Sequence, residues 1–318
     1  MRTVKLLAAI AILAVPAVHA AGPAYPEKPI RFVIGSAPGS GPDIISRVLA
    51  DRLYGAWGQR IVVDSRPGVA GILSAELVLR SEPDGYTWMM LTSQLMVATA
   101  VYPNVKFNLD KDFASISLIG TVPFALVVNL ELPAKSVREL IELAKKTPLR
   151  YGSAGTGATE HLSGVLFTRL TGTDMLHVPY KGVAEALAAT MGKEVHLTYV
   201  VLPAVLALIQ AGRVRAVGVT SLKRTPLLPD VPSISETVAG YQTGGWYSVV
   251  APTGTPEAVL AKVSTEVVKA VKEPQFGEQL KRLGLEIVGS TRAELDAFRR
   301  AQRKQISEIV KVSGVDVK

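Results

Sequence analysis

Two glycine-rich turns contain most of the residues whose types and spacing suggest chemistry. The first spans 35–43 and the second spans 152–161, and each lies between a short apolar run and a helical pattern. Backbone N–H groups at the start of a helix are unpaired and attract negative charge without a cationic side chain. Glycine also allows close backbone approach. Two such turns facing one cleft would suit a ligand with a carboxylate at one or both ends.

Individual side chains near the turns leave alternatives open. Asp43 can accept a hydrogen bond from a ligand, or it can simply be an acid in the first turn of a helix, where the dipole favours it. Lys181 can be a charge partner or a solvated turn residue. Trp246 can form an aromatic wall of the cleft or pack at a hinge, and His161 can be a ligand contact or a capping histidine.

Most other chemistries lack the patterns that they need. The chain has no Gly-x4-Gly-Lys-Ser/Thr string, and Glu160 stands where a dinucleotide fingerprint has its third glycine, so no cofactor is expected. No two histidines have zinc-like spacing, so no metal is expected. No Gly-x-Ser-x-Gly elbow occurs. One catalytic alternative stays open, in which Ser153 and His161 approach each other as a hydrolytic pair.

The elements around the turns alternate between strand and helix patterns. Strands are expected at 30–34, 60–63, 88–91, 124–128, 150–153, 174–178, 195–200, 214–220 and 246–251. This alternation is typical of α/β units around largely parallel sheets. No low-complexity linker separates two halves of the chain. A second lobe must therefore be inserted into the first, with the chain crossing twice between them.

The first 20 residues predict a cleaved export signal. Arg2 and Lys5 precede an apolar run of about 13 residues, which is shorter than the ~20 residues of a membrane-spanning helix. Small residues before Ala21 suit a signal peptidase, so residues 1–20 are expected to be removed. We expect the mature protein in the periplasm, without a lipid anchor.

Composition narrows the class of protein further. The chain contains no cysteine, which excludes disulfides, cysteine–zinc sites and a lipidated thiol. The formal net charge is +8, but the basic residues are scattered among acids and no basic run is interleaved with aromatics. Nucleic acid is therefore not an expected partner.

At these motifs the chain resembles the Bug-type receptors of tripartite tricarboxylate transporters. The resemblance begins at Tyr25–Ile30 and continues in order through the whole mature chain. Its further segments are Ala37–Asp43, Asp64–Gly68, Pro83–Thr87, Asp110–Phe113, Tyr151–Leu162, His177–Gly182, Ala211–Arg215, Leu228–Ser233 and Ala251–Pro256.

The resemblance implies a two-lobe type II periplasmic-binding fold. Each lobe would be a mixed, largely parallel sheet flanked by helices, with two hinge crossings between the lobes. Lobe 1 would comprise residues 22–122 and 246–318, and lobe 2 residues 123–245. The implied partners are a small carboxylate and the large and small membrane subunits of the transporter, and the receptor itself is expected to be a monomer without enzymatic activity.

The resemblance also points to the residues that would hold the ligand. They are Ser36, Ala37, Gly39, Ser40 and Asp43 in the first turn, Thr92 and Ser93 after the third strand, and Ser153, Ala154, Gly155, Thr156, Gly157 and Thr159 in the second turn. His161, Lys181 and Trp246 complete the expected set.

Three positions depart from the usual pattern of such receptors. Ser40 replaces a second glycine, which would be strained if that position needs a positive φ. Pro42 removes an N–H donor, and Val69 is bulky where small residues are common. The expected ligand is therefore left open among di- or tricarboxylates, acidic amino acids and aromatic carboxylates. A periplasmic sensor subunit that feeds a signalling kinase is the alternative to a transport receptor.

Overall fold

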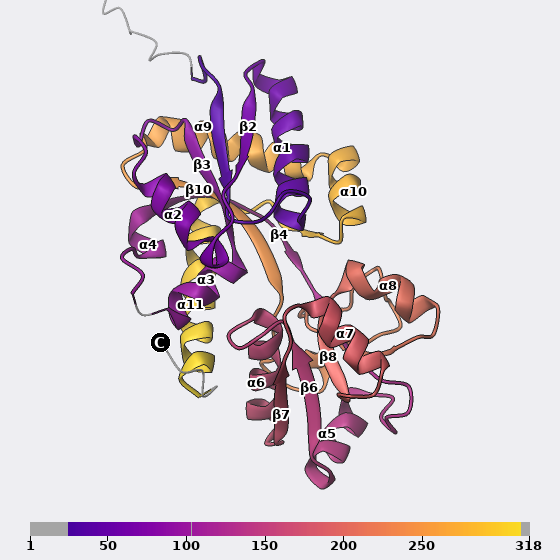
Figure 1. The fold of residues 1–318 in the computed structure, drawn as a ribbon. Coiled ribbons are helices and arrows are strands. Elements are labelled where there is room, and N and C mark those ends of the chain that lie inside the picture. Colours follow the sequence, from indigo (N-terminus) through magenta and orange to yellow (C-terminus); the bar gives the residue numbers. More distant parts are fainter. Residues whose placement is uncertain (1–24, 103, 313–318) are drawn as a thin grey trace, which may run out of the picture.

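The computed structural model describes residues 25–102 and 104–312, which form two β-sheets with helices packed around each (Figure 1). The predicted export signal and its cleavage point lie outside the described residues. Within residues 25–102 and 104–312, no helix has both the length and the apolar character needed to cross a membrane.

The first sheet has six strands in the order β11-β4-β10-β3-β1-β2. They are β1 (Ile30–Ile34), β2 (Ile61–Ser65), β3 (Thr87–Thr92), β4 (Phe113–Val122), β10 (Gly245–Pro252) and β11 (Glu286–Ile287). The strand β1 pairs in parallel with β2 and β3, whereas β10 runs antiparallel to both β3 and β4. Helices α1 (Gly41–Trp57), α2 (Ile72–Leu79), α3 (Ser93–Val101), α4 (Leu109–Asp112), α9 (Glu257–Lys272), α10 (Pro274–Arg282) and α11 (Arg292–Val312), with the short turn η1 (Val69–Gly71), belong to this part.

The second sheet has five strands in the order β7-β6-β8-β5-β9. They are β5 (Phe124–Val128), β6 (Leu149–Ser153), β7 (Met175–Pro179), β8 (Leu197–Val201) and β9 (Arg215–Val219), flanked by α5 (Val137–Lys146), α6 (Thr159–Thr171), α7 (Val183–Met191), α8 (Leu202–Gln210) and η2 (Ile234–Glu236). The strand β6 is parallel to β7 and β8, and β5 is antiparallel to β8 and β9. Two mixed sheets flanked by helices confirm the predicted two-lobe α/β class.

The chain crosses between the sheets at two places that lie side by side. Only Pro123 separates the end of β4 from the start of β5, and the return path leads from β9 to Gly245 at the start of β10. Gly245 pairs with Val122 in the first sheet. Gly244 has φ 143°, and a Cβ there would lie 2.9 Å from the Val122 carbonyl oxygen. This close approach requires glycine where the two connections meet.

The strand β4 was not predicted from the sequence, although its ten residues make it the longest strand described. Its apolar pattern is interrupted by serines that are nevertheless buried. The Ser117 hydroxyl donates to the Ser290 carbonyl (2.8 Å), and the Ser115 hydroxyl donates to Asp296 (2.5 Å). Buried polar groups are tolerated when they find partners, and here those partners come from residues more than 170 positions away.

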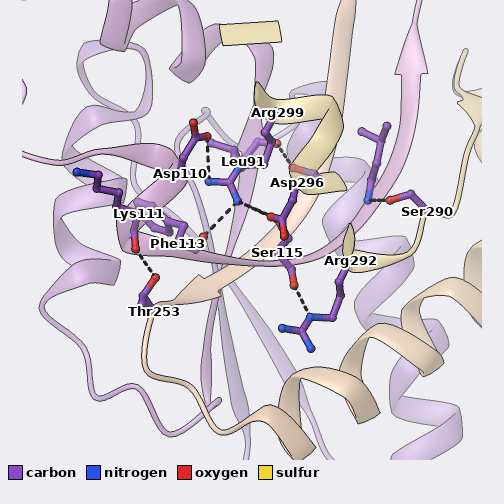
Figure 2. A network of polar contacts seen from close by, with 12 residues as sticks. Leu91, Asp110, Lys111, Phe113, Ser115, Thr253, Ser290, Arg292, Asp296 and Arg299 are labelled. Carbon is purple, nitrogen blue, oxygen red and sulfur yellow. Dashed lines mark hydrogen bonds and ion pairs between the residues drawn. The ribbon is translucent and has the colours of Figure 1, made fainter. Parts of the chain in front are cut away.

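A buried arginine anchors the last helix, α11, to the first sheet (Figure 2). The Arg299 side chain is 1% exposed, and its Nη1 donates to the Phe113 carbonyl (3.2 Å) and to Ser115 Oγ (2.8 Å). Asp110 and Asp296 each place a carboxylate oxygen 3.9 Å from its guanidinium. From this anchor α11 continues beyond the first sheet and contacts α6 of the second part (Figure 1).

Candidate functional site

A cleft of about 640 Å³ lies between the two parts of the molecule. Its walls include the turn after β1, the segment after β3 and the turn after β6, all at carboxyl ends of parallel strands. Open α/β sheets bind ligands at such edges, and this volume is in the range of small-molecule sites. The cleft is therefore the candidate ligand site.

Nine of the predicted ligand residues line this cleft together. They are Ser36, Ala37, Ser40, Thr92, Ser93, Ala154, Thr156, Gly157 and Thr159. They come from three separate stretches of chain, and the tertiary fold brings them to one cavity.

Three helices begin at the walls of the cleft. The N-caps of α1 and α6 are Ser40 and Ala158, and neither provides a side-chain hydrogen bond to the helix start, whereas Thr92 Oγ1 accepts from Leu95 N–H (3.3 Å) at the start of α3. Pro42, in the first turn of α1, contributes no N–H. The remaining N–H groups give the cleft positive partial charge. No lysine or arginine is among the residues that line the cleft in the described chain.

The first turn adopts its shape without strain at Ser40. That residue has φ −73°, and the left-handed position is taken by Gly39 at φ 79°. The Ser40 hydroxyl donates to the Ala37 carbonyl (2.6 Å), which closes the turn on itself. A glycine is therefore not required at position 40 in this turn.

Asp43 and Gly39 do not line the cleft. They are hydrogen-bonded to each other and fix the shape of the first turn. Asp43 is 3% exposed, and its Oδ2 accepts from Gly39 N–H (2.9 Å) and Arg47 Nε (3.0 Å). Its Oδ1 accepts from the Ser65 hydroxyl (3.3 Å). The Arg47 hydrogen bond holds the pKa of Asp43 below its usual range, against the opposing effect of burial. Asp43 is therefore ionised, and its hydrogen bonds hold the turn in place.

In the second turn, Ser153, Gly155 and His161 likewise lie outside the lining and shape the backbone. Ser153 Oγ accepts from Gly155 N–H (3.1 Å), and His161 Nδ1 accepts from Gly157 N–H (3.1 Å). Burial, and to a smaller extent His177, lowers the pKa of His161 to about 4. A neutral His161 is the form that can accept the Gly157 hydrogen bond.

The structure does not show the Ser153–His161 pair of the hydrolase alternative. The Ser153 hydroxyl lies 2.6 Å from His177 Nε2, and His161 instead stacks on the His177 ring with centroids 3.9 Å apart. The Ser153 side chain is fully buried. Sequence spacing favoured His161 because it is near along the chain, whereas parallel pairing of β6 with β7 brings in His177.

Lys181 and Trp246 do not line the cleft. Lys181 is exposed, and its backbone N–H donates to Glu185 (3.1 Å). Trp246 is 2% exposed, packs edge-to-face on Phe298 with ring centroids 5.5 Å apart, and lines a separate cavity of about 240 Å³ near the crossings. The structure favours the hinge-packing alternative for Trp246.

Sequence reasoning missed two prominent lining residues, Tyr247 and Glu160. Successive side chains of a strand point to opposite faces, so the burial of Trp246 behind the sheet directs Tyr247 toward the cleft. The Tyr247 hydroxyl lies against the first turn, 3.2 Å from where a Cβ at Gly41 would be. Burial raises the pKa of Tyr247 to about 12, so its hydroxyl is protonated. The alternation of side chains along β10 was the signal in the sequence that could have identified Tyr247 as a lining residue.

Backbone strain is concentrated in the segment between β2 and α2. Val69 has φ 44° and Ala70 has φ 54°, both in the left-handed region, and Ala70 lines the cleft. A β-branched residue is a clear outlier at such a φ. The bulk that the sequence shows at Val69 therefore coincides with a conformation better suited to glycine or asparagine.

Comparisons with protein families and with known proteins agree with the resemblance seen in the sequence. The family model described as tripartite tricarboxylate transporter family receptor matches residues 45–315. The UPF0065 protein in the tcbD-tcbE intergenic region of Pseudomonas sp. (strain P51) is 35% identical over 270 residues, or 84% of this chain and 80% of the relative. Protein BugT of Bordetella pertussis (strain Tohama I) is 29% identical over the full length of both chains.

Solved structures are similar along nearly the whole chain. R. palustris Rpa4515 with adipate has a TM-score of 0.77 and 33% identity, covering 91% of this chain and 98% of that one. The periplasmic binding protein BugD has a TM-score of 0.74 and 32% identity, with 92% and 99% covered. MatC from Rhodopseudomonas palustris with bound malate has a TM-score of 0.72 and 26% identity, with 90% and 100% covered.

Proposed function

The chain belongs to the tripartite tricarboxylate transporter receptor family, and from that premise we propose that it captures a small carboxylate in the cleft described above. After export to the periplasm, it delivers this ligand to the membrane subunits of a tripartite transporter. One observation carries the proposal: glycine-rich turns at the starts of α1 and α6 line opposite walls of a cleft of about 640 Å³.

The charge pattern of the cleft supports an anionic ligand. Helix N-termini attract carboxylates, and small residues in the two turns allow the ligand to approach the backbone. The hydroxyls of Ser36, Thr156 and Thr159 add donors among the lining residues. Two similar structures carry bound adipate and bound malate, which are carboxylates of suitable size.

Closure of the two parts around the crossings would bring the turns together on the ligand. The paired segments at Val122 and Gly244–Gly245 form the covalent connection, and movement there would open or close the cleft. Binding would return the ligand unchanged, because the buried Ser153–His177 pair supports the turn and presents no exposed nucleophile.

Thermal unfolding of the purified mature protein with a panel of carboxylates tests the ligand class. A ligand present at 100 times its Kd should add ~2.7 kcal/mol to the free energy of unfolding. Neutral sugars and organic cations serve as the negative panel. Stabilisation by those compounds together with no response to any carboxylate would refute the proposed ligand class.

Delivery is tested separately by uptake of the radiolabelled ligand in cells that carry the membrane subunits. Uptake should require the receptor and should be lost when its gene is deleted. Mass balance on the ligand incubated with the protein should return the same compound, and a hydrolysis product would overturn the receptor assignment.

A further inference from the structure

Glu160 is a buried acid in the cleft that the proposed function does not use. It lies in the first turn of α6, lines the cleft and is 8% exposed. Within the described chain, its carboxylate has no hydrogen bond or ion pair with the side chain of any other residue, and only its own backbone N–H interacts with it. A nearly buried carboxylate without a partner is costly, so its presence requires a reason.

Among the described residues that line the cleft, none has a cationic side chain that could compensate Glu160. The other ionisable side chains that line the cleft are those of Tyr102 and Tyr247, and neither can carry positive charge. Burial raises the pKa of Glu160 above its ordinary value, while its own backbone N–H opposes this. The position at a helix N-terminus favours the ionised form. A cationic group of a ligand beside Glu160 would favour the ionised carboxylate further, against the effect of burial.

The charge layout of the whole cleft is thus mixed. The starts of α1 and α3, on the first-sheet side, present positive partial charge, and the opposite wall carries the Glu160 carboxyl group, which a ligand cation would hold in its ionised form. A dicarboxylate closed in this space would place one carboxylate near Glu160 with no cation to offset the repulsion. A zwitterion would instead match both signs.

We propose that Glu160 receives a ligand ammonium group and so makes this receptor selective for amino carboxylates. The carboxylate of the ligand would bind at the starts of α1 and α3, and its ammonium would pair with Glu160 as the lobes close. This inference rests on the proposed carboxylate-binding function and narrows its ligand class. Glu160 acts here as a specificity-determining residue.

The experiment compares ligands that differ only in the amino group. The pairs are L-glutamate and glutarate, L-leucine and 4-methylpentanoate, and L-phenylalanine and 3-phenylpropanoate, measured by calorimetry with the mature wild-type protein. The amino member should bind at least tenfold more tightly in every pair that binds. This comparison requires no variant, so it stands even if a substitution prevents folding.

The variant Glu160→Gln keeps the size of the side chain and removes its charge. Its affinity for the amino member should fall at least ~30-fold, which is about 2 kcal/mol, while the deaminated member binds as well or better. Glu185→Gln is the matched control, because Glu185 is an exposed acid in the first turn of α7 outside the cleft lining. That control should leave both affinities unchanged.

Three results would overturn the inference. If the deaminated carboxylates bind as tightly as their amino partners, Glu160 does not bind an ammonium group. The proposed carboxylate-binding function would still stand. An equal loss of both affinities in Glu160→Gln would assign Glu160 a structural role. Failure of every carboxylate in both series to bind would remove the proposed function as well.

Discussion

Ser153 and His177 lie on the neighbouring parallel strands β6 and β7, and Ser153 Oγ is 2.6 Å from His177 Nε2 beneath the second glycine-rich turn. The same hydroxyl accepts from Gly155 N–H at 3.1 Å. Ser153 is fully buried and is hydrogen-bonded both to His177 on β7 and to Gly155 in the turn. It therefore fixes the position of the turn relative to the sheet. The pair therefore supports the second glycine-rich turn at the wall of the cleft.

Ser153→Ala should lower the free energy of unfolding by about 1–3 kcal/mol, because it leaves the Gly155 N–H and the His177 ring without a partner. Carboxylate affinity should also fall, since the turn loses its support. Urea unfolding and calorimetry measure the two effects. Thr265→Ala, which removes an exposed hydroxyl from α9, should change stability by less than about 0.5 kcal/mol. No change in Ser153→Ala would contradict the supporting role.

His161 should make the protein sensitive to mild acid. Its pKa is about 4 in the folded state because of burial and, to a smaller extent, His177, against 6.5 in the unfolded chain. Between these values the unfolded state binds more protons, so stability is complete above pH 6.5 and falls as pH decreases toward 4. The loss amounts to roughly 3 kcal/mol.

His161→Asn tests this pH dependence. An asparagine oxygen can replace Nδ1 as the acceptor for Gly157 N–H but does not titrate in this range. Urea unfolding at pH 7, 5.5 and 4.5 should show a shallower decline for the variant than for the wild type. Identical pH profiles would assign the acid sensitivity to other groups.

Val69→Asn should stabilise the protein by about 0.5–1 kcal/mol. Val69 has φ 44° and is 50% exposed, so the substitution relieves backbone strain with little loss of packing. Val62→Asn is the matched control, because Val62 is 52% exposed on the edge strand β2, where valine is favoured. Thermal unfolding should show opposite signs for the two variants, and a loss in Val69→Asn would mean that its side-chain contacts outweigh the strain.

Ala37→Asp should weaken carboxylate binding and leave the fold intact. Ala37 is exposed and lines the cleft. Two unit negative charges ~6 Å apart at an effective dielectric of ~20 repel by about 3 kcal/mol, or roughly 100-fold in affinity. Ala184→Asp places the same charge in the first turn of α7, outside the cleft lining, and should bind normally. Equal affinities in the two variants would remove the first turn from the site.

Arg299→Ala should destabilise the protein by about 3–5 kcal/mol. The substitution removes the buried partner of Ser115 and of the Phe113 carbonyl (Figure 2) and leaves a cavity between α11 and β4. Arg300→Ala, at the next, exposed position of α11, should cost little. Urea unfolding distinguishes the two, and similar stabilities would show that the network in Figure 2 contributes little to the fold.

The local parts of the structure could be predicted well. Apolar runs identified most strands, and turn glycines followed by helical spacing located the starts of α1 and α6. Both signals depend on backbone geometry within about ten residues. They can therefore be recognised in the sequence without knowledge of the tertiary contacts. The strand β4 was not predicted because the main partners of its buried serines are Ser290 and residues of α11, which lie far away in the sequence.

By itself, then, the sequence determined the α/β alternation and the two glycine-rich turns, and it predicted that these turns favour negative charge. Only the tertiary structure decided that Ser153 pairs with His177, that Tyr247 faces the cleft while Trp246 packs behind it, and that Glu160 is buried there without a partner. The physical reason is that hydrogen-bond partners and solvent exposure depend on segments brought together by folding. Local spacing reports the backbone conformation of a segment, and packing between segments assigns its side chains their environment.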